Sequence, residues 1–196
     1  NCQQSKSCWQ KRCALVFKYF LIFLFLLLFS NTNASDKEKI IEKLQNTKNL
    51  VFEFEQNING KIENGNCIIQ YPKKIYCKYL KKNKILVSNG KSLVIKTISS
   101  FYRYPLKKTP LSLILDKNFL IKKIYNLKDG ILGETYMSFV ILENDNEINI
   151  FFDNKTFNLI GWQTKDIYQN INVTYLSSIK INQKINESLF KLPAQD

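Results

Sequence analysis

Paired acidic side chains are the residues of this chain that could most directly do chemistry. Glu53 and Glu55 are two positions apart, and Asp153 and Asp166 lie near the ends of two predicted strands. Two carboxyl groups that face each other can divide general acid and general base work, as in a secreted hydrolase. Solvated residues on a strand face or at a strand end have the same spacing, and the pattern favours this structural interpretation.

Other catalytic motifs lack their partners. The sequence contains no histidine, which excludes serine–histidine and cysteine–histidine nucleophile pairs and most metal sites. The run Asn89-Gly-Lys-Ser92 looks like the end of a phosphate-binding loop, but the earlier glycine of that motif would fall at Ile85. We interpret the run as a hairpin turn, and we expect no enzyme, no metal and no cofactor.

Cys67 and Cys77 are the two cysteines beyond the N-terminal region. If the chain turns at Pro72 between two strands, a register centred on this proline places the two cysteines opposite each other, and a register shifted by one residue separates them diagonally. A disulfide is therefore one possibility in an oxidising compartment. Two small side chains facing the core are the other.

The first 34 residues have the layout of an export signal. An apolar block of about 11 residues, Tyr19–Phe29, is too short for a bilayer span of ~20 residues, and Ala34 provides a small residue for a cut before Ser35. We expect a cleaved signal peptide over residues 1–34, with a retained anchor as the alternative. The basic residues ahead of the block are Lys6, Lys11, Arg12 and Lys18.

Removal of this segment would leave one domain over residues 35–196, exported to the periplasm. It would keep 25 of the 29 basic residues against 16 acidic ones, a net charge of +9. Nearly all of this charge is lysine, with Arg103 the one arginine that remains. Since arginine dominates specific phosphate and base contacts, we expect no nucleic-acid partner.

The expected domain begins with a helix and continues mainly as strands. Ser35-Asp-Lys-Glu38 forms a capping-box pattern, and apolar residues at helical spacing continue to about Asn49. Ten strands are predicted by patterning: Leu50–Ile58, Lys61–Tyr71, Ile75–Leu80, Ile85–Ser88, Leu93–Ile98, Lys122–Leu127, Tyr136–Leu142, Glu147–Asp153, Leu159–Asp166 and Val173–Ile181.

Tight turns between these strands indicate an antiparallel meander. Asn-Gly pairs stand at 59–60, 64–65 and 89–90, and Asp129-Gly130 is a further turn signal. So many strands in one domain predict a mainly β, α+β fold, with a strongly curved antiparallel sheet or unclosed β-barrel.

A short apolar helix is predicted after Thr109 and Pro110. Pro110 suits the first helical position and Thr109 the cap before it. The following Leu111, Leu113, Ile114 and Leu115 point around most of the helix, so one packed face cannot cover them all.

The predicted sheet has one markedly apolar face. Phe52 and Phe54 share one side of their strand while Glu53 and Glu55 share the other. An ordinary sheet packed on helices would show this pattern. However, two short helices cannot fill the concavity of about ten strands, so the barrel is either small and closed or holds a cavity.

Short motifs follow one another in a defined order and spacing along the chain. They are Phe54-x-Gln56, Gly65, Pro72, Tyr79, Ile85–Leu93, Pro105–Leu115, Leu159-Ile-Gly-Trp162, Asp166, Val173-Thr174 and Ser188-Leu-Phe190. In this order and spacing the chain resembles LolA, the periplasmic lipoprotein carrier of Gram-negative bacteria, over nearly all of residues 35–196.

The resemblance implies an unclosed barrel whose apolar interior, under a lid of helices, receives the acyl chains of lipoproteins. It also implies that the protein is a monomer. Its implied partners are an inner-membrane lipoprotein-releasing ABC transporter complex and an outer-membrane lipoprotein receptor. The alternative is a binding protein or sensor for another lipid, such as a glycolipid or phospholipid. The expected cavity residues are Phe52, Phe54, Ile69, Ile75, Tyr79, Leu93, Ile95, Phe139, Ile141, Ile150, Phe152 and Trp162, and the expected lid residues are Ile40, Ile41, Leu44, Leu111, Ile114 and Leu115.

One position departs from the family pattern. Many members have an arginine before the proline equivalent to Pro72, and that arginine bonds to the lid. This chain has Tyr71 there. A tyrosine hydroxyl offers one donor where a guanidinium offers five, so we expect Tyr71 to be a weaker latch or the lid to be latched elsewhere.

Overall fold

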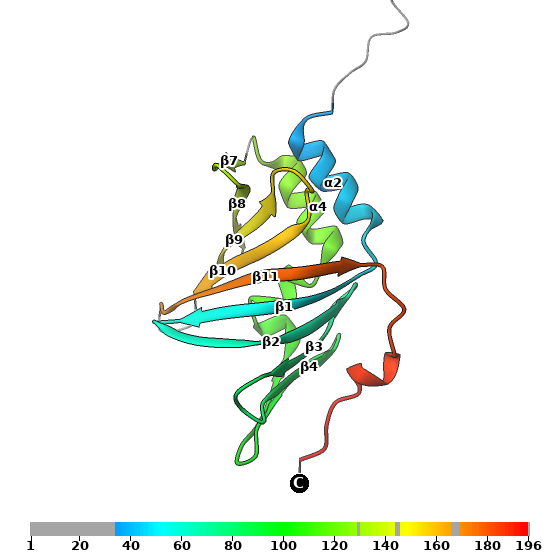
Figure 1. Ribbon diagram of the computed structural model, residues 1–196, viewed down its shortest axis with the longest axis vertical. Helices are drawn as coiled ribbons and strands as arrows, with labels where there is room; N and C mark the ends of the chain where they lie inside the picture. Colours follow the sequence, from blue (N-terminus) through cyan, green and yellow to red (C-terminus); the bar gives the residue numbers. More distant parts are fainter. Residues whose placement is uncertain (1–33, 129, 144–145, 166–168, 196) are drawn as a thin grey trace, which may run out of the picture. The chain divides into compact units, whose positions relative to one another are not determined.

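The computed structural model describes residues 34–128, 130–143, 146–165 and 169–195. The expected signal peptide over residues 1–34 therefore lies almost wholly outside the described residues. From Ser35 onward the chain is one compact unit. Within the described ranges, eleven strands form one antiparallel sheet in the order β6-β5-β4-β3-β2-β1-β11-β10-β9-β8-β7 (Figure 1). The sheet is curved and not closed, which confirms the predicted unclosed β-barrel.

The helices lie before β1, in the connection between β6 and β7, and near the C-terminus. They are α2 (Asp36–Asn46), η1 (Leu106–Lys108), α3 (Leu111–Ile114), α4 (Lys117–Asn126) and η2 (Glu187–Phe190). The strands are β1 (Asn49–Ile58), β2 (Lys61–Gln70), β3 (Lys74–Tyr79), β4 (Ile85–Asn89), β5 (Ser92–Lys96), β6 (Phe101–Pro105), β7 (Ile131–Leu132), β8 (Tyr136–Glu143), β9 (Asn146–Asp153), β10 (Leu159–Lys165) and β11 (Ile171–Ile181).

The order of the strands determines where the helices lie. β1 pairs with both β2 and β11, so it joins a first meander, β1 to β6, to a second, β7 to β11. The ends of the two meanders, β6 and β7, are thus opposite edges of the sheet. The chain between them must return across the sheet, and η1, α3 and α4 lie in this return.

The helix α2 begins where the capping box predicts. The Ser35 hydroxyl accepts from the amide of Glu38 at 3.3 Å, and the Glu38 carboxylate accepts from the amide of Ser35 at 2.7 Å. Ile40 and Leu44 are buried on the inner side of the helix. The helix packs against α4, and the two run side by side in Figure 1.

The strand predicted at Lys122–Leu127 is wrong, because this segment belongs to α4. The side chain of Asp116 accepts from the amide of Phe119 at 3.1 Å and starts the helix, and Leu120 and Ile124 are buried one turn apart. The six residues that suggested a strand are too few to reveal a helical period, whereas the longer run from Asp116 reveals it.

Two edge strands were not predicted. β6 has five residues and no buried face, so no apolar side of the strand marks it in the sequence. β7 has two residues and is exposed. Neither strand carries the periodicity on which a strand prediction rests.

The predicted turn at Asn64-Gly65 is also wrong, because both residues lie inside β2. Gly65 pairs with Phe54 on β1, and a β-carbon at this position would lie 2.6 Å from the Phe54 ring. The glycine therefore provides room for an aromatic ring. The turns at Asn59-Gly60 and Asn89-Gly90 are confirmed, with both Gly60 and Gly90 at positive φ.

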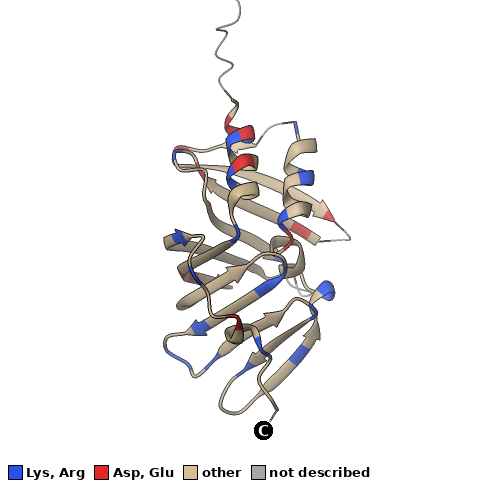
Figure 2. Cartoon of the chain, turned by 90° about the vertical axis from the view of Figure 1, so that its right-hand side faces the viewer, with Lys and Arg blue, Asp and Glu red and all other residues tan. Residues whose placement is uncertain are grey.

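The core lies between the concave face of the sheet and the helices. Its largest fully buried side chains are Phe139, Phe152, Ile40, Ile69, Ile75, Leu106, Ile114, Leu115, Leu120, Ile124, Ile148 and Ile150. Basic residues occur on strands, loops and both long helices, without gathering on one element (Figure 2). No helix in the described ranges is long and apolar enough to span a bilayer.

Cys67 and Cys77 are directly opposite each other on β2 and β3 and form a disulfide. This confirms the register centred on Pro72. The bond closes a hairpin over a sequence separation of 10, and loops of this length restrict the unfolded chain enough to stabilise a fold by ~2–3 kcal/mol.

We predict that replacing both cysteines, Cys67→Ala with Cys77→Ala, lowers the free energy of unfolding by ~2–3 kcal/mol. Urea unfolding of the variant and of the oxidised wild type measures this difference. The reduced wild type serves as the control and should lose a similar amount. Equal midpoints for the oxidised and reduced protein would contradict the stabilising role of the bond.

Candidate functional site

The return from β6 to β7 places a short apolar helix over the sheet. The turn η1 is fixed by the amide of Leu106, which donates to the carbonyl of Lys91 at 2.9 Å. Pro110 then occupies the cap position of α3 with φ −56°. The Thr109 hydroxyl donates to the carbonyl of Leu106 at 2.8 Å, so Thr109 ends η1. The prediction that Thr109 caps α3 is wrong.

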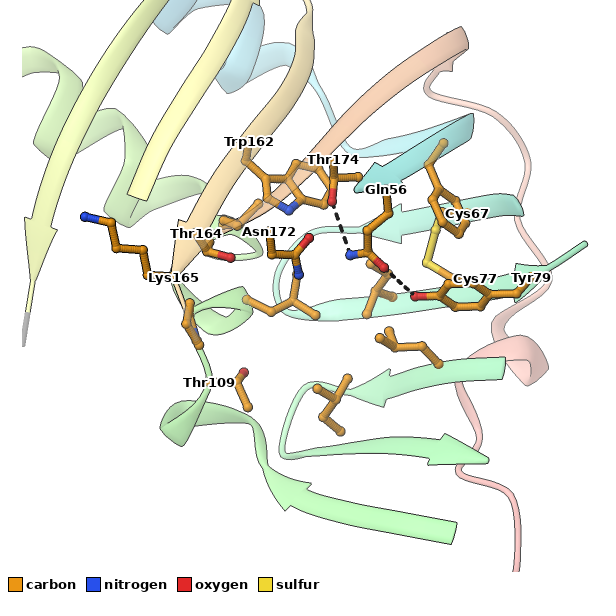
Figure 3. Close-up of a pocket in the computed structure, with 17 residues that line it drawn as sticks. Gln56, Cys67, Cys77, Tyr79, Thr109, Trp162, Thr164, Lys165, Asn172 and Thr174 are labelled. Carbon is orange, nitrogen blue, oxygen red and sulfur yellow. Dashed lines mark hydrogen bonds between the residues drawn. A yellow bond between two sulfur atoms is a disulfide. The ribbon is translucent and has the colours of Figure 1, made fainter. Parts of the chain in front are cut away.

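A cavity of about 220 Å³ lies between α3 and the concave face of the sheet (Figure 3). Side chains from both halves of the sheet and from the lid line it. They are Phe54, Gln56, Cys67, Ile75, Cys77, Tyr79, Leu86, Leu93, Thr109, Pro110, Leu111, Ile114, Trp162, Thr164, Lys165, Asn172 and Thr174.

Aromatic side chains form one wall of this cavity. The rings of Phe54 and Tyr79 meet edge to face with centroids 4.9 Å apart. Trp162 meets Phe52 in the same manner at 6.5 Å. Such edge-to-face pairs hold their rings in fixed orientations, so the wall is preformed.

The disulfide is part of the apolar lining. Cys67 and Cys77 both line the cavity, each with 4% of its surface exposed. The bond therefore holds β2 and β3 together in the wall of the cavity that α3 also borders. The sequence predicted this pair only as a structural element, without a place in the site.

One end of the cavity is polar. The hydroxyl of Tyr79 donates to the Gln56 carbonyl at 3.2 Å, and the Gln56 amide donates to the Thr174 hydroxyl at 3.3 Å (Figure 3). Thr164 and Asn172 lie opposite each other on β10 and β11 and also line the cavity. Sequence analysis missed this cluster, although alternation with Trp162 and Leu176 placed Thr164 and Thr174 on the inner face.

The predicted cavity residues divide into two groups. Phe54, Ile75, Tyr79, Leu93 and Trp162 line the cavity, together with the predicted lid residues Leu111 and Ile114. The second group is in the packed core outside the cavity lining. It comprises the predicted cavity residues Phe52, Ile69, Phe139, Ile141, Ile150 and Phe152 and the predicted lid residues Ile40, Leu44 and Leu115, with the predicted lid residue Ile41 partly buried against them. Ile95 is half-buried and belongs to neither set.

The second group is explained by the helices α2 and α4. The buried residues of α2 and α4, Ile40, Leu44, Leu120 and Ile124, belong to the same packed core as these side chains, whereas the segment that carries α3 borders the cavity. Because part of α4 was predicted as a strand, the predicted fold had one covering helix too few. The sequence therefore predicted a larger open concavity than the fold has.

The lid is held to the sheet by the turn that follows Tyr71. The amide of Lys73 donates to the carbonyl of Leu115 at 2.9 Å, and the Lys73 ammonium pairs with the Asp116 carboxylate at 3.0 Å. The Tyr71 hydroxyl is buried and has no hydrogen-bond partner among the described residues. Burial also raises the pKa of Tyr71 well above its usual value, so the hydroxyl stays protonated.

The structure places three of the four acidic residues that have possible catalytic spacing. Glu53 and Glu55 are exposed, and Glu53 accepts from the Ser178 hydroxyl at 3.2 Å. Asp153 accepts from the hydroxyl and amide of Thr156 in a strand-end turn, and these bonds lower its pKa. Asp166 lies outside the described residues. Within the described ranges, no three His, Cys, Asp or Glu side chains gather to hold a metal ion.

A partly buried carboxylate lies next to the aromatic wall. Glu63 pairs with Lys82 at 2.5 Å and with Lys84, and the Lys84 ammonium lies 3.7 Å from the centroid of the Tyr79 ring. Burial raises the pKa of Glu63, but hydrogen bonds from the two lysines outweigh it, so the pKa lies below the ordinary value of 4.5.

We predict that Glu63 makes part of the stability depend on pH. With a lowered folded-state pKa, the folded protein binds fewer protons than the unfolded chain, so this contribution is present above pH 4.5 and is lost as pH falls through the folded-state pKa. Urea unfolding at pH 6 and pH 3 measures the free energy of unfolding at each pH. Between pH 6 and pH 3 this free energy should fall more for the wild type than for Glu63→Gln. Equal losses would contradict the assignment.

We predict that Asp116 anchors the lid region through two separable contacts. Asp116→Ala removes both the helix cap and the ion pair and should lower the free energy of unfolding by ~1–2 kcal/mol. Asp116→Asn keeps a capping side chain and removes the ion pair alone, so it should lower the free energy of unfolding by less than ~1 kcal/mol. This decrease should become smaller at high salt. Thermal unfolding at low and high salt measures both variants, and equal losses in the two would contradict the division.

Three solved structures illustrate what this chain is similar to, each at low sequence identity. An uncharacterised conserved protein from Thermus thermophilus has 8% identity and a TM-score of 0.50, over 82% of this chain and 94% of that one. A LolA superfamily protein from Nitrosomonas europaea has 8% identity and a TM-score of 0.42, over 81% and 99%. LprF from Mycobacterium bovis has 12% identity and a TM-score of 0.42, over 77% and 94%.

Similarity in sequence is found at the level of the family. No curated protein matches the chain. The profile of the family described as "Outer membrane lipoprotein carrier protein LolA" matches residues 45–193. This match spans β1 to β11, the return that carries α3, and the closing turn η2. By this match over most of its length, the chain belongs to the LolA family of outer membrane lipoprotein carrier proteins.

Proposed function

We propose that this protein binds the acyl chains of lipoproteins in the cavity under α3 and carries them through the periplasm from the inner to the outer membrane. The observation that carries the proposal is a largely apolar cavity bounded on one side by a short helix, within the part of the chain that the family profile matches. No enzymatic step is required, because binding and release are the whole task.

The physical need for such a carrier follows from the chemistry of the cargo. Burying an acyl chain is worth ~0.8 kcal/mol per CH₂, so a ~16-carbon chain would cost ~13 kcal/mol to leave in water. A carrier must shield the chain and must also release it. It therefore needs a site whose occupied and empty states are close in free energy.

The helix α3 is suited to supply that balance. Ile114 is 0% exposed and lines the cavity together with Leu111. The cavity of about 220 Å³ is smaller than the ~300–1,000 Å³ of most ligand sites, so a long acyl chain must displace α3. The side chains of the lid then compete with the ligand for the same sheet surface.

The expected partners follow from this role. A cargo protein with acyl chains, an inner-membrane lipoprotein-releasing transporter and an outer-membrane receptor would load and unload the cavity. Export by the segment over residues 1–34 would bring the protein to the periplasm. We include all of these in the proposal.

We predict that Ile114→Asp abolishes acyl-chain uptake and leaves the sheet folded, because it places a charge where either the sheet or an acyl chain must be apolar. Displacement of a hydrophobic dye by palmitoyl chains measures uptake, and circular dichroism checks the fold. Leu142→Asp is the matched control, since Leu142 is 70% exposed on β8, and it should bind as the wild type does.

If Ile114→Asp unfolds, Leu111→Asp tests the same prediction of lost acyl-chain uptake. Leu111 is only partly buried, so its replacement disturbs the core less. A wild-type protein that binds no hydrophobic dye would contradict the proposal. Release of lipoproteins from spheroplasts on addition of residues 35–196 would support carriage. Release of free glycolipid or phospholipid alone would instead indicate a carrier or sensor for another lipid.

A further inference from the structure

The polar end of the cavity is built from four neutral side chains on three adjacent strands. Gln56 on β1 is opposite Thr174 on β11, and Asn172 on β11 is opposite Thr164 on β10. Thr174 and Asn172 are two residues apart on one strand, so both face the concave side. Figure 3 shows the four side chains together at one end of the cavity.

Three of these groups are buried or held in place. The Gln56 amide is fixed between the hydroxyls of Tyr79 and Thr174, at 3.2 Å and 3.3 Å. Thr174 and Thr164 are 3% and 9% exposed. Polar groups that are this well buried and oriented can fix the position of a ligand without rearranging.

The fourth group, Asn172, has an unsatisfied acceptor. Its side-chain carbonyl oxygen is buried and has no hydrogen-bond partner among the described residues, yet Asn172 lines the cavity. Native proteins leave few buried polar atoms unpaired, and such an atom in a cavity wall requires a donor from elsewhere. A ligand with an N–H or O–H group beside its hydrocarbon chain would supply one.

The charge at this end argues against an anionic group. Lys165 also lines the cavity, but its ammonium pairs with the Glu147 carboxylate at 3.0 Å. The other polar residues of the lining are neutral. A carboxylate or phosphate placed here would lose its hydration without gaining an unpaired cation.

We propose that the polar end binds a neutral amide that joins the acyl chain to the rest of the ligand, with Asn172 accepting from its N–H. This proposal rests on the proposed function, because the acyl chain must enter the same cavity. A secondary amide carries one donor and one acceptor and so complements a carboxamide, whereas an ester carries acceptors alone. The amide can belong to an N-acylated protein terminus or to a free N-acyl lipid.

The test compares two probes that differ in one group, N-methylpalmitamide and methyl palmitate. Each displaces a cavity-bound hydrophobic dye from the purified protein. For the wild type we expect the amide to bind about tenfold more tightly than the ester, and palmitate to bind no more tightly than the ester. In Asn172→Leu the preference for the amide should fall to about twofold or less, while ester binding is retained.

Asn149→Leu is the matched control. The side-chain carbonyl of Asn149 is also buried and without a partner among the described residues, but Asn149 is on β9 and does not line the cavity. This variant should keep the wild-type preference. Loss of the preference in Asn149→Leu as well as in Asn172→Leu would overturn the assignment to the cavity.

The outcomes separate this inference from the proposed function. If dye and ester bind but the wild type shows no preference for the amide, the inference is overturned and acyl-chain binding stands. If neither binds, the proposed function fails first. An N-palmitoylated dipeptide amide distinguishes the sources: binding tighter than N-methylpalmitamide supports an acylated protein terminus, and weaker binding supports a free N-acyl lipid.

Discussion

The antiparallel pairing of β1 with β11 is the constraint on which the rest of the structure depends. It joins the first strand of the sheet to the last, from Leu50 opposite Ile181 to Ile58 opposite Asn172. Two meanders thereby become one sheet whose free edges, β6 and β7, are far apart in the strand order. Because the chain must connect these edges, it carries η1, α3 and α4 across the concave face. The position of α3 over the sheet is therefore a consequence of strand order.

The same arrangement explains why the concave face is divided. α2 and α4 pack against each other and cover one part of it, where Phe139, Phe152 and Ile150 are fully buried. The four-residue helix α3 covers the other part, and there a cavity remains. The division gives one region that is packed core and one in which a short helix borders a cavity. The turn at Lys73 links the two, since it contacts Leu115 at the end of α3 and Asp116 at the start of α4.

Much of the fold was predictable from local pattern. The capping box at Ser35, the hairpin turns at Gly60 and Gly90, and most inner strands depend on residues near each other in sequence, so their signals survive in the sequence. The exceptions have physical reasons. α4 was predicted as a strand because six residues do not reveal a helical period, and β6 lacked a buried face. Gly65 resembled a turn, but a β-carbon there would collide with the backbone carbonyl of Lys78 and the ring of Phe54 on the two neighbouring strands.

The sequence by itself determined the fold class, the family and the apolar character of the inner face, because periodicity and motif order are properties of the chain. Only the tertiary structure decided which apolar residues line a cavity and which are packed core, since that depends on where α2 and α4 lie. It also brought Gln56 to Thr174, 118 residues away in sequence, and left the carbonyl of Asn172 unpaired at the cavity wall. Local sequence patterns do not predict contacts between residues so far apart in sequence. They also do not predict which polar atoms remain without a hydrogen bond in the folded protein.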